Sequence, residues 1–537
     1  TVRRVHDGVL LPLRSYKNGA KKKPEVGSLI IWQEGGEFHV TGHVAVVTQV
    51  EEEQICFIEQ NVDNNIWPEG QNYSRTLHIS RTVEGGYWLE CSIDDATILG
   101  WVTQTEETEF AETFEDVDYK LFNLQLAVVD QLEPSRSDWL DPKEAAVKAY
   151  IQMMGGAKMV CDDEEARKYF RVSKPCEEEL MRATNELHSM INHATQVVLQ
   201  DDELLKKFNF PEILWPKIRQ SWNNRRNQIV TGRMDFAVSE AGIKLYEYNA
   251  DSASCHMETG FVQQEWAKTY GCEDGVSSGR NLRSFLVSAW KEVPIEGTLI
   301  HIMCDVDQEE TYHALWMKGI IEDAGYKTAV IRGCEGLSFD GNGQVIDKNG
   351  DMVKWVWKTW AWETALDQVR LQLEEKGRFK IGRNADELCL ADVLLHDDVM
   401  VFEPLWTLIP SNKAILPILW SIFPNHPFLL KSSFTLDDEL MENGYVSKPI
   451  VGRCGDNISL FDKDNNLISE TSGRFDDRDY IFQQLWKLPK IDGKNVQVGT
   501  FCAIGQYAGA CIRADASPII TSKSDTYPLR VVKIIGE

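Results

Sequence analysis

Side chains that can hold a metal ion and contact phosphate gather in one stretch, residues 231–256, which reads TGRMDFAVSEAGIKLYEYNADSASCH. Its alternating pattern predicts two short strands joined by a Glu-Ala-Gly turn. Because side chains two apart on a strand point the same way, Glu247 and Asn249 share a face. Asp235 meets them from the paired strand, with Arg233 beside it. Two carboxylates and an amide are oxygen ligands that suit Mg2+, although an ordinary antiparallel pair with a polar outer face explains the same alternation.

Two lysines and a glycine-bearing loop offer contacts for phosphate further along the chain. Lys413 directly precedes an apolar helix, and Lys448 lies on a strand that leads into the loop Gly452-Arg-Cys-Gly455. Backbone amides in such a loop can cradle phosphates. The chain contains no GxxxxGKS or GxxxxGKT segment, so this is not a Walker loop, and a plain hairpin fits the same residues. Residues 481–486 supply a hydrophobic wall for a base, and Arg513 ends a later strand-like run.

The elements around these groups predict a mixed α/β architecture. Residues 298–303 form a buried strand, a helix runs through Ala324, and residues 328–332 form the next strand. This βαβ unit indicates a parallel sheet. Four carboxylates follow its first strand, at Asp305, Asp307, Glu309 and Glu310. Carboxylates at a helix N-terminus complement its dipole, but four exceed that need, and the cluster equally suits an amine or a polyamine.

The N-terminal part of the chain predicts a small β-rich unit with a possible second site. Short apolar runs between residues 27 and 61 have the length of strands. His43 opens one predicted strand and Glu59 closes the next, so the two side chains lie at one end of the sheet. A histidine oriented by a carboxylate is the base half of a nucleophilic site, and a structural histidine is the alternative. No cysteine precedes Cys56, which sits inside a predicted strand.

Composition bounds the class of protein. A chain of 537 residues with 43% hydrophobic and 26% charged residues is typical of a globular protein of at least two domains. No run of 18 apolar residues predicts a membrane helix. A formal net charge of −27 argues against a nucleic-acid partner. Twelve cysteines without any Cys-x-x-Cys pair argue against a zinc ribbon and favour reduced thiols in the cytoplasm.

The metal patch, the two lysines, the glycine loop and the late arginine together fit an ATP-grasp arrangement, in which two antiparallel sheets clamp ATP. Longer segments then carry a resemblance. They read GRMDF at 232–236, YEYNADSASC at 246–255, WKTWAWET at 357–364, PSNKAILP at 410–417 and KPIVGRCG at 448–455. These segments look like the synthetase half of the glutathionylspermidine synthetase/amidase family. The chain is similar throughout to the two-step trypanosomatid type of that family, the trypanothione synthetases.

The resemblance implies a multidomain α/β and α+β chain. The GHVAVV run at 42–47 and the EQN run at 59–61 look like the CHAP-type, papain-like cysteine amidase domain of the family. We therefore expect a partial CHAP-type domain over residues 1–105 and an ATP-grasp carbon–nitrogen ligase domain over residues 139–537. The acidic, threonine-rich segment between them predicts a linker over residues 106–138.

The resemblance also implies roles for individual residues. By the resemblance, Mg2+ is held by Asp235, Glu247 and Asn249. The reacting carboxylate and the transferred phosphoryl group face Arg233 and Arg513. The residues for ATP are Lys413, Lys448, Cys454, Gly455, Gln483, Gln484, Leu485, Trp486 and Gln497. Those for substrates are Ser252, Glu310 and Thr364 for glutathione, and Glu309 and Asp525 for the polyamine. His43 and Glu59 would serve the amidase.

The implied reaction joins the glycine carboxylate of glutathione to spermidine, and then to glutathionylspermidine, through an acyl phosphate formed from ATP. Addition of the first glutathione alone, and a polyamine-binding protein with an inactive ATP site, are the alternatives. The family's nucleophilic cysteine lies upstream of the histidine, and this sequence begins at Thr1 without a methionine. We therefore expect an N-terminally truncated chain, with conjugate-cleaving amidase activity in the full-length protein only.

Overall fold

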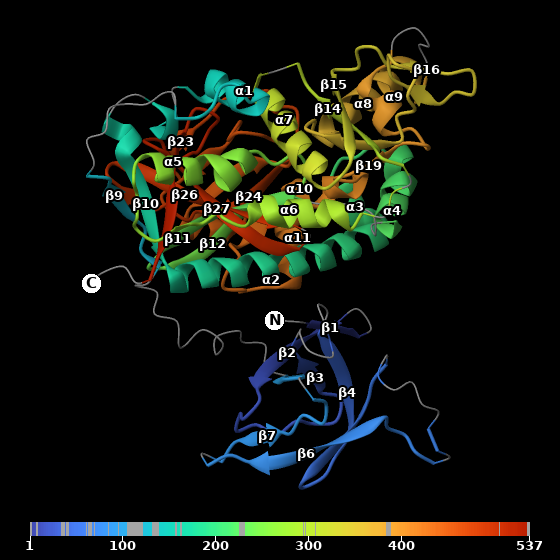
Figure 1. Cartoon of the computed structure of the whole chain (residues 1–537), viewed down its shortest axis with the longest axis vertical. Coiled ribbons are helices and arrows are strands. Elements are labelled where there is room, and N and C mark those ends of the chain that lie inside the picture. The colour runs from blue at the N-terminus through green and yellow to red at the C-terminus, as the bar shows by residue number, and fades with distance from the viewer. Residues whose placement is uncertain are drawn as a thin grey trace. The chain divides into compact units, whose positions relative to one another are not determined.

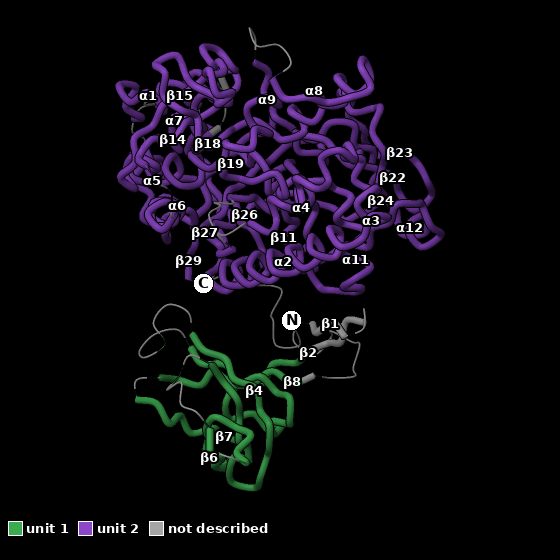
Figure 2. Tube along the Cα trace, turned by 90° about the vertical axis from the view of Figure 1, so that its right-hand side faces the viewer, with its two compact units in different colours: residues 1–115 green, residues 116–537 purple. Residues whose placement is uncertain are grey.

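The structure is a computed structural model of the chain. It describes all residues except 1–2, 7–8, 34–37, 39–41, 61, 63–66, 69, 84, 95, 105–121, 131–138, 156–157, 162–163, 225–230, 294, 296, 307, 383–387, 504 and 534–537. The chain divides into two compact units, Thr1–Glu115 and Asp116–Glu537, which Figure 2 colours separately. Each unit is described by itself below.

An eight-stranded antiparallel sheet makes up the described part of the first unit, in the order β1-β2-β8-β3-β4-β5-β6-β7. The strands are β1 Arg3–His6, β2 Val9–Lys17, β3 Leu29–Trp32, β4 His43–Val50, β5 Gln54–Ile58, β6 Arg75–Arg81, β7 Tyr87–Leu89 and β8 Ile98–Gln104. Alternate residues of β3, β4 and β5 point into one core that includes Ile30, Val47 and Phe57. The expected β-rich N-terminal unit is therefore confirmed.

The second unit is built around an antiparallel sheet in the order β12-β11-β26-β27-β28, with the short β25 Lys490–Ile491 also pairing with β26 (Figure 1). Its strands are β11 Thr231–Ser239, β12 Gly242–Asn249, β26 Lys494–Ala503, β27 Gln506–Asp515 and β28 Asp525–Tyr527. The expected hairpin of residues 231–249 forms its β11–β12 edge. The long helix α2 Lys174–Gln200 packs against β26 and β27.

Helix α2 shows how local sequence sets this packing. Ser173 caps the helix, since its Oγ accepts a hydrogen bond of 3.2 Å from the backbone N–H of Cys176, and Pro175 occupies the first turn. Leu180, Leu187 and other apolar residues at helical spacing are buried against the sheet. The helix therefore supports β26 and β27 from one face of the sheet, and β26 pairs directly with β11 of the hairpin.

Two further sheets flank the central one. The first is parallel, in the order β15-β14-β18-β19, and confirms the expected βαβ unit. Its elements are β14 Leu299–Cys304, α7 Gln308–Asp323, β15 Lys327–Arg332, β18 Trp355–Lys358, α8 Trp362–Lys376 and β19 Met400–Val401. The second is antiparallel, in the order β20-β24-β21-β22-β23. Its strands are β20 Ser432–Ser433, β21 Tyr445–Pro449, β22 Ser459–Phe461, β23 Leu467–Glu470 and β24 Tyr480–Gln484.

The remaining elements cover these sheets. A small sheet runs in the order β13-β29-β10-β9, and β16 pairs with β17. These strands are β9 Gln125–Val128, β10 Lys168–Ser173, β13 Val276–Ser277, β16 Ser338–Phe339, β17 Val345–Ile346 and β29 Leu529–Val532. The other helices are α1 Ala145–Met154, α3 Asp202–Lys206, α4 Trp215–Asn223, α5 Gln263–Thr269, α6 Leu282–Lys291, α9 Leu390–Leu394, α10 Leu408–Ser411, α11 Ile415–Ile422 and α12 Asp438–Asn443.

The predicted linker 106–138 differs from the structure at β9. This strand pairs with β10 in antiparallel register, Leu126 opposite Phe170, so folded structure of the second unit begins before residue 139. The physical reason is the short apolar segment Leu126–Val128, which can pair as a strand. The acidic residues around it made the whole segment look like a linker in the sequence. Residues 105–121 and 131–138, the rest of the predicted linker, largely lie outside the described residues.

A close backbone approach beside α6 gives a test of this packing. A Cβ at Gly279 would lie 1.8 Å from the carbonyl oxygen of Thr259, in the π-helical turn Glu258–Val262. Because backbone atoms have to move, we expect Gly279→Ala to lower the free energy of unfolding by about 1–3 kcal/mol. Urea denaturation measures this. Gly341→Ala, where a Cβ meets nothing within 4 Å, is the control and should change stability by less than about 0.5 kcal/mol. Superimposable unfolding curves for the Gly279→Ala variant and the parent would contradict the predicted contact.

Candidate active site

The β11–β12 hairpin brings the expected oxygen ligands together. In its register Asp235 lies opposite Glu247 and Arg233 opposite Asn249, and a bulge follows Asp235. Arg233 and Asp235 are buried, whereas Glu247 remains partly exposed. These four polar side chains line a cavity of about 230 Å³. The polar outer face of an ordinary hairpin would instead point into solvent, so we favour a binding site.

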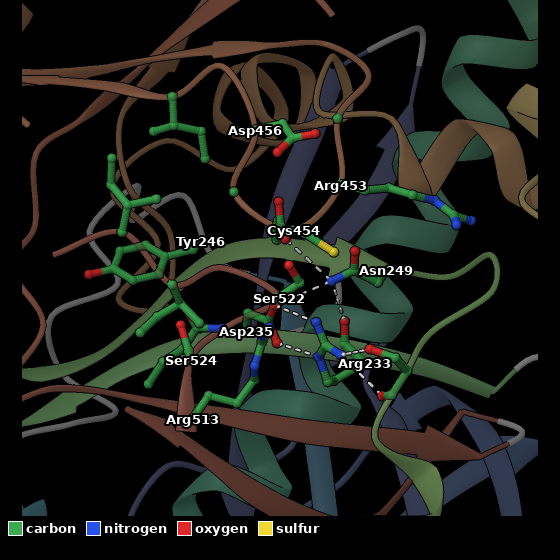
Figure 3. Close-up of a pocket in the computed structure, with 18 of the residues that line it drawn as sticks. Arg233, Asp235, Tyr246, Asn249, Arg453, Cys454, Asp456, Arg513, Ser522 and Ser524 are labelled. Carbon is green, nitrogen blue, oxygen red and sulfur yellow. Dashed lines mark hydrogen bonds and ion pairs between the residues drawn. The ribbon is translucent and has the colours of Figure 1, made fainter. Parts of the chain in front are cut away.

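Cations already neutralise both carboxylates. The guanidinium of Arg233 binds Asp235 in a bidentate pair, with Nε 2.7 Å from Oδ1 and Nη2 3.0 Å from Oδ2. The ammonium of Lys413 lies 3.1 Å from Glu247 Oε2. Figure 3 shows Arg233, Asp235 and Asn249 joined by contacts, with Cys454 and Arg513 on either side. A buried carboxylate is tolerated only with such partners. A ligand that binds this patch therefore needs a cation for the carboxylates of the patch and anionic groups for its arginine and lysine.

The protonation of this patch suits a divalent cation. Burial by itself would raise the pKa of Glu247, but the ammonium groups of Lys413 and Lys448 outweigh it and lower that pKa. Glu247 is therefore ionised at neutral pH. The amide of Asn249 turns Nδ2 toward Asp235 Oδ2, at 3.3 Å, and a half-turn of this amide would present its oxygen to a metal instead. Two carboxylates and one amide oxygen fit Mg2+, which keeps room for water and phosphate oxygens.

Two lysines from different elements reach the same cavity. Lys413 Nζ contacts the carbonyl oxygen of Gly452 at 3.3 Å, and Lys448 Nζ contacts Gln483 Oε1 at 2.6 Å. Burial lowers the pKa of Lys448 to about 8, a shift that Lys413 increases and Glu247 opposes. Both ammonium groups thus lie against neutral oxygens and the carboxylates of the patch, where phosphate oxygens would be stronger partners.

The expected loop between β21 and β22 has the geometry of a close-approach turn. Cys454 and Gly455 adopt positive φ angles of 51° and 74°. A Cβ at Gly455 would lie 2.4 Å from the carbonyl oxygen of Ile520, so only glycine fits there. Both residues line the cavity, and the backbone amides of such a loop can cradle a phosphate.

An apolar slot adjoins the lysines. Leu485 and Trp486 line it together with Val446, Leu460 and Ile519, and the side chains of Gln483 and Gln497 add polar groups. Aromatic and aliphatic walls with a few convergent polar atoms are typical of a site for a flat heterocycle. Gln484 does not line the cavity: it is the neighbour of Gln483 on β24, so its side chain points to the opposite face.

The expected substrate residues divide into two groups. Arg513, Ser252 and Glu310 line the cavity. Thr364 and Asp525 do not. Asp525 Oδ2 forms an ion pair of 2.6 Å with Lys494, which occupies the carboxylate predicted for a polyamine. The side chain of Glu309 lies outside the described residues.

The cavity also contains residues that sequence reasoning did not assign. Ser254 accepts hydrogen bonds from Arg233 Nη1 at 3.0 Å through both its carbonyl oxygen and its hydroxyl. Asp251, Glu258 and Tyr312 line the wall beside Glu310. For Asp251 and Ser254 the signal was their place in the small, polar run that follows the metal ligands. Glu258 and Tyr312 carry no comparable sequence signal.

The first unit holds the expected histidine–carboxylate pair. His43 Nε2 lies 2.8 Å from Glu59 Oε2, and the ring of His43 stacks on Phe38 with centroids 4.6 Å apart. Arg75, which the sequence did not single out, grips the same carboxylate from the other side through Nε and Nη2, at 2.5 and 3.0 Å. A carboxylate fixed by an arginine orients the imidazole firmly, as a general base requires.

Comparisons with known proteins agree with this geometry. The family model described as glutathionylspermidine synthase preATP-grasp matches residues 131–532, and the CHAP domain model matches residues 8–61. Together with the sheets described above they confirm the expected fold class. No helix among the described residues is long and apolar enough to cross a membrane.

Curated relatives match almost the whole chain. A bifunctional glutathionylspermidine synthetase/amidase of Escherichia coli is 45% identical over 99% of this chain and 86% of its own length. Trypanothione synthetase of Crithidia fasciculata is 32% identical, over 98% of this chain and 82% of its own length. Glutathionylspermidine synthase of the same organism is 29% identical, over 97% and 81%. The expected trypanosomatid type is not confirmed, since the bacterial bifunctional protein is the more similar.

The lowered pKa of Lys448 gives a test of the phosphate site. The ammonium is present below pH 8 and is lost as the pH rises through about 8. We expect the affinity for Mg–ATP to fall by about tenfold between pH 7 and pH 9, since binding loses one charge contact. Isothermal titration calorimetry measures it. Lys448→Arg keeps its charge and should bind with little dependence on pH. A parent protein whose affinity is constant over this range would contradict a phosphate contact by Lys448.

Proposed function

We propose, since the chain belongs to the glutathionylspermidine synthetase/amidase family, that it is a ligase that uses ATP to join the glycine carboxylate of glutathione to an amine of spermidine. The observation that carries this proposal is the single cavity that combines Asp235, Glu247 and Asn249 with Lys413 and Lys448. An oxygen-ligand patch next to two ammonium groups matches a metal–triphosphate pair.

The reaction follows from what these residues hold in place. Lys413, Lys448 and the amides of the Cys454–Gly455 loop would bind the phosphates of ATP, and Leu485 and Trp486 would flank its base. Asp235, Glu247 and Asn249 would hold Mg2+, which supplies charge neutralisation for the phosphates. The chain needs no nucleophile of its own, because the glycine carboxylate of glutathione attacks the terminal phosphorus and ADP leaves.

The two arginines would stabilise the charge that this transfer spreads. Asp235 and Ser254 fix the orientation of Arg233, and its close contact with Asp235 outweighs burial and raises its pKa, so its guanidinium stays charged. Arg513 lies opposite Gln497 in the β26–β27 register and lines the same cavity. A neutral amine of the polyamine then attacks the acyl phosphate carbon, phosphate leaves, and the nitrogen gives up a proton. Preorganised charge and positioning supply the rate.

A carboxylate-lined wall supports spermidine as the second substrate. Glu258 and Glu310 line the cavity, whereas Asp251, which also lines it, is already ion-paired with Lys358. A polyamine with several positive charges needs anionic partners as it leaves water. The fully ion-paired Asp525 is the weaker candidate for this role, unless Lys494 moves away from it. ATP use and the absence of any Cys-x-x-Cys pair among the twelve cysteines favour the cytoplasm as the place of the reaction.

Addition of a second glutathione is the further activity to weigh. Identity of 45% to the bacterial synthetase/amidase, against 32% to a trypanothione synthetase, supports glutathionylspermidine as the product. Hydrolysis of that conjugate is the second function we propose. The CHAP match over residues 8–61 and the His43–Glu59–Arg75 chain support it.

Removal of a metal ligand tests the ligase. We expect Asp235→Ala and Glu247→Ala each to lower ADP release by at least about 100-fold, because phosphate charge is no longer neutralised. A coupled assay with glutathione, spermidine and Mg–ATP measures the rate. Glu375→Ala, an exposed carboxylate of α8, should keep the parent rate. ATP hydrolysis by the parent that ignores glutathione and spermidine would refute the proposed reaction.

Analysis of the product by mass spectrometry separates one addition from two. With glutathione, spermidine and ATP, we expect the mass of glutathionylspermidine to accumulate, since the identity values favour the single step. Supplying glutathionylspermidine as the only amine should then give no ATP-dependent product. The mass of a bis-glutathionyl conjugate in either reaction would show that the chain performs both steps.

A further inference from the structure

We infer that Glu403, a buried residue outside the cavity wall, is a positioning residue that sets the affinity for glutathione by holding the loop of Ser252. The inference deepens the proposed function and rests on it. It concerns the five consecutive residues Asp251–Cys255, all of which line the cavity directly after the metal ligands of β12.

The loop has a conformation that its own sequence does not favour. Ser252 adopts a φ of 59° and Cys255 a φ of 73°. Both values lie in the left-handed region, where the backbone of any residue other than glycine is strained. Strain of this kind persists only where the surroundings fix the backbone. The contacts behind the loop therefore decide how Ser252 is presented to the cavity.

Glu403 provides the contact to the backbone of Ser252. Its Oε2 accepts a hydrogen bond of 3.1 Å from the Ser252 N–H, and its Oε1 accepts one of 2.9 Å from the hydroxyl of Thr231. Glu403 is 1% exposed and has itself a φ of 60°. The indole of Trp362 donates to its carbonyl oxygen at 2.8 Å. Glu403 is thus fixed on both its backbone and its side chain, and its carboxylate ties the loop to the start of β11.

A second buried contact steadies the preceding residue. The ammonium of Lys358 lies 2.5 Å from Asp251 Oδ1, and the backbone N–H of Trp362 donates to Asp251 Oδ2 at 2.7 Å. These groups hold Asp251, whereas Glu403 alone contacts the backbone of Ser252 among the interactions that the described residues make. A change at Glu403 is therefore expected to alter Ser252 and to leave the metal ligands in place.

The charge state of Glu403 agrees with this role. Burial raises the pKa of Glu403 to about 7, an effect that Lys358 opposes and Asp251 reinforces. Burial raises the pKa of Tyr248, and the charge of Glu403 adds to that rise. Above pH 7 the ionised group accepts from both donors, and charge-assisted hydrogen bonds are the stronger ones. As the pH falls through about 7 the group becomes protonated and its hold on Ser252 weakens.

The experiment compares KM values of Glu403→Ala and Glu403→Gln in the coupled ADP-release assay. In Glu403→Ala the Ser252 N–H loses its acceptor, so we expect the KM for glutathione to rise by about tenfold, with the KM for ATP within about twofold of the parent. Glutamine keeps an oxygen acceptor and should restore most of the affinity. Glu177→Ala is the matched control. It removes another buried carboxylate, that of Glu177 on α2, which pairs with Arg280, and should lower thermal stability without changing the KM for glutathione.

Each outcome separates the inference from the proposed function. A parent protein that lacks glutathione-dependent turnover refutes the function itself. A parent with that turnover, and a Glu403→Ala variant whose KM values for glutathione and ATP are unchanged or rise together, overturns the inference. Where Glu403→Ala does not fold, the glutamine variant decides. For this variant we compare the ratio of its KM for glutathione to the KM of the parent. The ratio should rise from pH 6 to pH 8, because Glu403 of the parent becomes ionised over this range and glutamine does not. A ratio that stays constant overturns the inference.

Discussion

Charge pairing on the β11–β12 hairpin is the constraint on which the site depends. Asp235 and Arg233 are buried side by side, and loss of one partner from such a pair costs about 3–5 kcal/mol, since the other is left without compensation. Glu247 has Lys413 in the same way. In the proposed reaction a divalent cation would take the place of Lys413 beside Glu247, and a phosphate would take the place of Glu247 beside Lys413. Each of these charged groups would then keep a partner of opposite sign when the ligand binds.

The rest of the second unit holds the carboxylates and the cations of the site at fixed positions. The hairpin pairs with β26, which α2 supports from behind, so the carboxylates lie on a rigid sheet. Lys448 comes from the other antiparallel sheet, on the far side of the cavity, and the strained loop at Cys454 and Gly455 joins two strands of that sheet. A ligand between the sheets therefore touches both, which is how a clamp of two sheets orders a triphosphate.

The sequence predicted those parts of the site that depend on local patterning. Alternation along the second strand placed Glu247 and Asn249 on one face, but their pairing with Asp235 depends on the bulge after Asp235, which the sequence pattern does not show. The assignment of Lys413 and Lys448 to ATP depended more on the resemblance, because an isolated lysine has no sequence pattern that marks it as a phosphate contact. Glu403 and Lys358 were missed, since their partners lie more than 100 positions away and the tryptophans around Lys358 are typical of a core. Gln484 was grouped with its neighbours although alternate residues of a strand face opposite ways.

Net charge is a poor guide to the ligand of this cavity, and local charge explains why. The chain carries a formal charge of −27, which by itself disfavours a polyanion such as ATP. Yet Arg233, Lys413, Lys448, Arg453 and Arg513 all line the cavity. The acidic lining is divided, with Asp235 and Glu247 among the cations and Glu258 and Glu310 on the wall beyond them. In the proposed reaction one end of the cavity would bind a nucleotide with its metal and the other a polyamine, and the net negative charge of the protein would attract the polyamine. In the proposed reaction an acidic protein binds ATP because cations from separate elements converge, and here Arg233 of β11, Lys448 of β21 and Arg513 of β27 line one cavity.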